Sequence, residues 1–242
     1  MGITEAMTKA TSSSKISLKV RQWMLFVAIA SFLTEMILAQ MASVLWGGVL
    51  TKYILSMGIF ILALGLGSLY QPKGVAGEKL AWQQLVMSGM SIFSPWLVLW
   101  SGTHLYSWFA KFIAASAVFV VGFWSGMEFP LIASIASEEV GADFSFVFSE
   151  LLRLDYLGMA ISSLFFPVFL LRNIGVFQAS FLAAGVNLFI AAMAFWQYMP
   201  GFRLKKSSFK FQFFLVLGFI LIASGWVLNK ELISLAQEWM IQ

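Results

Sequence analysis

The stretch Phe32–Tyr70, FLTEMILAQMASVLWGGVLTKYILSMGIFILALGLGSLY, contains two long apolar runs separated by a short break with two glycines. A helix needs about 20 mostly apolar residues to cross the hydrocarbon core of a bilayer. Comparable runs recur along the rest of the chain, each followed by a short polar segment. We therefore expect an all-α fold, a polytopic membrane bundle of about seven transmembrane helices.

The expected domain organisation is one transmembrane domain between a polar N-terminal tail and an amphipathic C-terminal tail. Residues 1–22 form the cytoplasmic polar tail, residues 23–229 the helical domain, and residues 230–242 a short amphipathic C-terminal tail. The expected spans, with boundaries good to a few residues, are about 23–45, 53–70, 81–101, 105–125, 146–171, 175–198 and 211–229.

Composition supports a bilayer setting and excludes several classes of chemistry. The chain is 60% hydrophobic and 11% charged, whereas soluble domains are about half apolar and a quarter charged. It has no cysteine and one histidine, His104, which excludes disulfides, thiolate sites and multi-histidine metal sites. No phosphate-binding loop or strand–turn–helix glycine motif is present, and no basic face suits nucleic acid. We expect no cofactor, no metal and no nucleic-acid partner.

The distribution of lysine and arginine predicts the orientation. With the N-terminus inside, the inside loops carry ten basic residues and the outside loops three, Lys52, Arg172 and Lys230. Because basic residues accumulate in cytoplasmic loops, we place the N-terminus in the cytoplasm. The expected location is the bacterial inner membrane. Seven spans then put the C-terminal tail on the far side, unless that tail lies along the membrane surface.

Ionisable residues within or beside the spans are costly and are functional candidates by default. They form a candidate intramembrane polar site: Glu35, Lys111, Glu128, Glu150, Arg153 and Asp155. Glu35 either faces a cavity as a cation or proton site or pairs with a basic residue such as Lys111. Lys111 either reaches the interface or is buried against an acid.

The segment Gly126–Leu131, GMEFPL, is expected to be a helix break, with Gly126 and Pro130 as its breaking residues. Glu128 lies at that break, as polar groups do in transporters with discontinuous helices; the alternative is a helix end whose acid reaches water. Glu150 and Arg153 are three residues apart and are expected to pair at the membrane boundary, while Asp155 points elsewhere.

The stretch Phe32–Tyr70 resembles the first two helices of the membrane-embedded spermidine-synthase-like (polyamine aminopropyltransferase-like) family. Glu35 matches a glutamate of its first helix, and GMEFPL resembles its glycine–glutamate–proline–leucine motif. The stretch from Leu154 to Trp196 resembles the following helix pair. Gln83 and Gln84 depart from the pattern, because an acidic residue is expected there.

The resemblance implies a seven-helix membrane domain, distantly like half of a major-facilitator carrier, followed by a soluble aminopropyltransferase domain. Because the chain ends at Gln242 without counterparts of that domain's catalytic acids and cofactor-binding glycines, we expect it not to be an enzyme. The expected function is a non-enzymatic membrane subunit or anchor that holds another protein subunit at the bilayer, or that self-associates. The alternative is a small carrier for a cationic solute such as a polyamine, acting as a dimer.

Overall fold

The structure is a computed structural model that describes residues 16–47, 50–69, 75–140, 144–198 and 206–228. The described residues are almost entirely helical and contain no strand. The elements are α2 Leu18–Leu45, α3 Leu50–Ser68, α4 Ala76–His104, α5 Ser107–Gly126, α6 Glu128–Val140, α7 Phe144–Phe165, the π-helix η1 Phe166–Leu170, α8 Leu171–Asn173, α9 Gly175–Tyr198 and α10 Lys206–Val227. The all-α prediction is confirmed.

Within the described ranges, seven helical stretches are long and apolar enough to cross a membrane, as judged by length and composition. Large apolar side chains such as Leu50, Leu164 and Trp196 are at least 70% exposed. Soluble monomers rarely expose apolar surface on this scale. The expected count of seven candidate spans therefore agrees with the structure.

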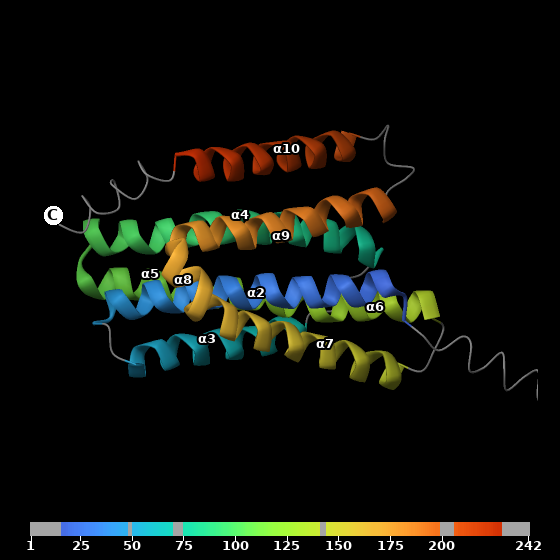
Figure 1. Ribbon diagram of the computed structural model, residues 1–242, viewed down its shortest axis with the longest axis horizontal. Helices are drawn as coiled ribbons and strands as arrows, with labels where there is room; N and C mark the ends of the chain where they lie inside the picture. Colours follow the sequence, from blue (N-terminus) through green and yellow to red (C-terminus); the bar gives the residue numbers. More distant parts are fainter. Residues whose placement is uncertain (1–15, 48–49, 70–74, 141–143, 199–205, 229–242) are drawn as a thin grey trace, which may run out of the picture.

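Helix α2 lies at the centre of the bundle and α10 at its edge (Figure 1). In the most apolar part of α2, 67% of residues are buried, against 11% in α10. α2 contacts α3, α4, α5, α6, α7 and α9, while α10 contacts α9 and α4. The side chains of α2 therefore reach most of the interior, and α2 and α4 together supply most of the buried polar residues in the described part of the chain.

Several boundaries differ from expectation: α4 begins at Ala76 rather than near residue 81, and α10 begins at Lys206 rather than near residue 211. The first helix begins at Leu18 rather than near residue 23, because the Ser17 hydroxyl accepts a hydrogen bond from the Val20 amide and caps it. The fourth span does not end near residue 125: α6 continues it after a single non-helical residue, Met127, so that the apolar stretch reaches Glu139. The tail at 230–242 lies outside the described residues.

Helices α3 and α5 approach closely through glycine. A side-chain carbon on Gly67 would collide with the backbone of Phe123, and one on Gly126 with the backbone of Leu64. Small residues permit such close crossings between membrane helices. The crossing fixes the position of Gly126, and with it the start of α6 two residues later.

Candidate functional site

Glu128 is the first residue of α6, and its side chain is only 3% exposed. The Ser31 hydroxyl donates to its Oε2 atom at 2.6 Å, and the Gln84 amide donates to its Oε1 atom at 2.7 Å. A longer bond of 3.3 Å comes from Ser125 to Oε2. The three donors belong to α2, α4 and α5, so one carboxyl group joins four helices.

Glu128 also lines a cavity of about 610 Å³ bounded by α2, α3, α5, α6 and α7. Asp155 of α7 lines the same cavity. These two acids, which are 27 residues apart in the sequence, are the ionisable residues among the described residues that line it. The full lining is Met24, Val27, Ala28, Ser31, Phe32, Phe60, Leu64, Ser68, Ser125, Gly126, Glu128, Phe129, Pro130, Ala133, Ser134, Phe148, Leu152, Asp155 and Met159.

Glu35 is buried separately, with 1% of its surface exposed. Neither carboxylate oxygen has a hydrogen-bond partner among the described residues. Lys111 is exposed and forms no ion pair with Glu35 within the described part of the chain. The pairing of Glu35 with Lys111 and the burial of Lys111 are therefore both wrong. Glu35 lies one helical turn after Ser31, on the same face of α2.

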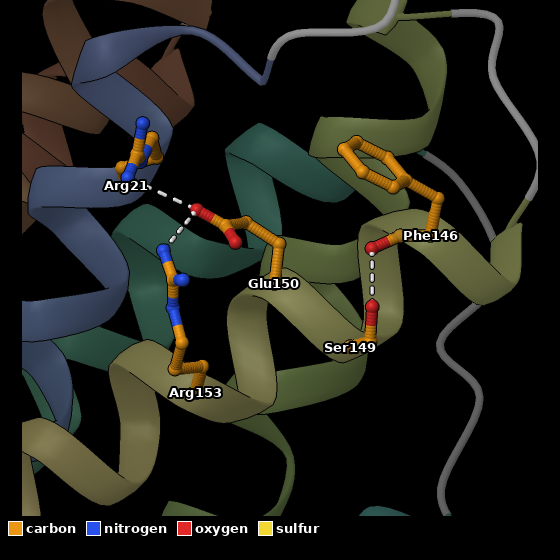
Figure 2. Close-up of polar contacts among 5 residues, drawn as sticks. All are labelled: Arg21, Phe146, Ser149, Glu150 and Arg153. Carbon is orange, nitrogen blue, oxygen red and sulfur yellow. Dashed lines mark hydrogen bonds and ion pairs between the residues drawn. The ribbon is translucent and has the colours of Figure 1, made fainter.

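Glu150 pairs with Arg153, as the spacing predicts, and also with a residue from another helix (Figure 2). Its Oε1 atom lies 2.9 Å from Nη2 of Arg153 and 3.0 Å from Nη2 of Arg21 in α2. The Arg153 side chain is 68% exposed, so its bond with Glu150 contributes little to stability. The Arg21 bond connects α2 to α7, which makes this cluster a structural link rather than part of the cavity.

The expected break at Gly126–Pro130 is a one-residue turn, not an unwound segment. Pro130 is the third residue of α6. The amide groups of the first four residues of a helix have no partner within it, so a proline there removes no helical hydrogen bond. The sequence predicts a break from Gly126 to Pro130. Of these residues, Met127 alone is non-helical, so the prediction is correct only there.

Sequence reasoning missed three residues that hold Glu128. Ser31 and Ser125 are unremarkable in apolar helices, and the only signal at Gln84 is its departure from the family pattern. A second buried polar contact joins α2 and α4: the hydroxyl groups of Thr34 and Ser91 form a hydrogen bond of 2.9 Å. An amide or hydroxyl on a buried face is a usable signal, but the sequence alone does not show which helix faces meet.

The described residues contain no group of three histidine, cysteine, aspartate or glutamate side chains that could hold a metal ion. The cavity offers carboxylates and hydroxyls rather than a complete ligand set. Its chemistry suits the binding of a small molecule or a proton through hydrogen bonds and charge.

The sequence matches no protein-family model and no solved structure. It is 25% identical over 175 residues to the polyamine aminopropyltransferase of Leptospira interrogans, covering 71% of this chain and 34% of that protein. It is 28% identical over 181 residues to polyamine aminopropyltransferase 2 of Ralstonia nicotianae, with coverage of 71% and 34%. Polyamine aminopropyltransferase 2 of Aquifex aeolicus is 26% identical over 208 residues, with coverage of 83% and 40%.

The expectation that the chain is not an enzyme is contradicted by these relatives, because their names are those of enzymes. The chain spans about a third of the length of the first relatives. Helices occupy most of the chain, so alignments of this length must run through several of them. The chain is distantly homologous to polyamine aminopropyltransferases, a spermidine-synthase-like relationship.

Proposed function

We propose that this chain is the membrane-embedded region of a polyamine aminopropyltransferase-type enzyme and positions the catalytic unit at the bilayer. The observation that carries the proposal is the shared activity name of relatives whose similarity extends over 71% or more of this chain in the alignments given above. Seven candidate spans support a location in the membrane. The catalytic unit belongs either to the same protein or to a bound partner subunit.

Membrane vesicles from cells with and without the chain test this proposal. The assay supplies an aminopropyl-bearing S-adenosylmethionine derivative and a labelled polyamine, and it measures the lengthened product. We expect activity that sediments with the membrane and falls to background when the chain is deleted. Equal activity in the two membrane preparations, or none in either, contradicts the proposal.

Affinity purification of the chain from those membranes identifies the catalytic unit. After purification in mild detergent, mass spectrometry should find a stoichiometric catalytic polypeptide, either joined to the chain or bound to it. The purified material should show aminopropyltransferase activity. A pure, inactive preparation from membranes that were active before solubilisation would show that the chain does not hold the catalytic unit.

A second candidate function is a carrier for a cationic solute, which the acidic cavity of Glu128 and Asp155 favours. The measurement is uptake of labelled spermidine into proteoliposomes. Glu128→Gln should abolish uptake, whereas Glu138→Gln, at an exposed acid of α6 outside the cavity, should leave it unchanged. Uptake that is insensitive to Glu128→Gln contradicts a carrier that works through this cavity.

A further inference from the structure

The cavity between α2, α3, α5, α6 and α7 carries only acidic ionisable groups among the residues described. Glu128 and Asp155 line it, and no lysine, arginine or histidine from the described part of the chain does. Arg21 and Arg153 pair with Glu150 and do not line it. Charges interact more strongly in a low-dielectric interior than in water. A cation is therefore favoured in this cavity and an anion disfavoured.

The hydroxyl groups of the cavity present hydrogen-bond acceptors. Ser31 and Ser125 donate their protons to Glu128, while Ser68 donates to the carbonyl of Gly65 and Ser134 to that of Pro130. These are the four serines in the lining. With each proton used, the serine oxygens retain lone pairs that can accept a hydrogen bond from a ligand. An ammonium group has three donors and no acceptor, and so complements such a lining.

The remaining walls are apolar and aromatic. Four phenylalanines line the cavity, and Met24 and Met159 add flexible apolar surface. The phenylalanines are Phe32, Phe60, Phe129 and Phe148. Aromatic faces attract ammonium groups and pack against methylene chains. A hydrated metal ion would gain little from such walls, so the lining selects an organic cation.

We propose that this cavity binds an aliphatic amine cation that carries two or more ammonium groups. Glu128 and Asp155 accept ammonium groups, and the phenylalanines contact the methylenes between them. A volume of about 610 Å³ lies within the range of small-molecule sites, roughly 300–1,000 Å³. The identification of the amine as a polyamine rests on the proposed function, whereas the preference for an organic cation rests on the cavity alone.

Equilibrium binding of labelled spermidine to the full chain in nanodiscs tests the site. Glu128→Gln and Asp155→Asn should each weaken binding about tenfold or more, because each removes a charge-assisted hydrogen bond. Two matched controls should bind as the unmodified chain does: Glu138→Gln, an exposed acid of α6, and Glu35→Gln, a buried acid outside the cavity lining. Weakening by the controls equal to that by the cavity variants contradicts the site.

Competition separates charge from shape and does not depend on any variant. 1,4-Diaminobutane should displace the label, while 1,4-butanediol, which has the same length and no charge, and Mg²⁺ should not. Displacement by the diol or by Mg²⁺ at the same concentration as the diamine overturns the proposal, as does the absence of any saturable spermidine binding.

Aminopropyl transfer measured on the membranes from which the chain was purified separates this proposal from the proposed function. If transfer activity is present but Glu128→Gln and Asp155→Asn leave spermidine binding unchanged, the amine site is contradicted and the enzyme assignment is not. Binding that these variants weaken, in membranes without transfer activity, supports the amine site and contradicts the enzyme assignment.

Discussion

Two glutamates buried in one bundle have opposite surroundings, although both are rare acids in apolar helices. Glu128 accepts three hydrogen bonds from α2, α4 and α5, whereas neither oxygen of Glu35 has a partner among the described residues. The sequence identified both acids because ionisable groups in spans are costly. It could not separate them, because the donors to Glu128 come from positions 31, 84 and 125, whose meeting depends on how the helices rotate against one another.

This contrast predicts opposite effects on stability. Glu128→Met leaves the Ser31, Gln84 and Ser125 donors without their acceptor and should lower the free energy of unfolding by about 1–3 kcal/mol. Glu35→Met replaces a buried, unpaired carboxyl with an apolar side chain of similar length, and should leave stability unchanged or raise it. Reversible unfolding in mixed detergent micelles measures both. A loss of stability in Glu35→Met as large as that in Glu128→Met would show that Glu35 makes a stabilising contact.

Helix α6 shows what the sequence could and could not predict about elements. Proline and glycine in GMEFPL indicated a break, and the chain does leave helical geometry there, but only at Met127. Pro130 occupies the first turn of the new helix, where no amide partner is lost. The expected helix boundary is wrong here because proline is compatible both with the end of one helix and with the first turn of the next. The seven-helix pattern holds because it depends on apolar length, which tolerates such errors.

The crossing of α3 and α5 makes a prediction at the same scale. Gly67→Ala would place a methyl group against the backbone of Phe123, and backbone cannot move aside as a side chain can. We expect a loss of about 1–3 kcal/mol from this overpacking. Gly65→Ala is the matched control, because a methyl group there has no neighbour within 4 Å. Alanine is the better helix former, so the control should be unchanged or slightly more stable.

Thermal unfolding of both variants in one detergent measures the difference. A lower Tm for Gly67→Ala than for Gly65→Ala supports the close crossing. Equal Tm values would mean that α3 and α5 lie farther apart than the structure places them. The close crossing would then not explain the position of Gly126 in the cavity wall.

For the whole molecule, orientation decides which compartment the acidic cavity serves. The cavity uses the second half of α3, the stretch 24–32 of α2 and the first half of the helical span Ser145–Asn173, so it lies in the half of the bundle that contains the start of α2. The excess of basic residues predicts that this half faces the cytoplasm. An amine site there would draw on the cytoplasmic pool.

Single cysteines test this orientation against a clean background, because the chain contains no cysteine. Tyr106, 84% exposed, lies between α4 and α5 at the predicted outer face, and Glu138 is exposed near the end of α6 at the predicted inner face. A membrane-impermeant maleimide should label Tyr106→Cys in intact cells and Glu138→Cys only after the cells are opened. The reverse pattern would turn the cavity outward and favour uptake of an external amine. Labelling of both from outside would contradict a membrane crossing between them.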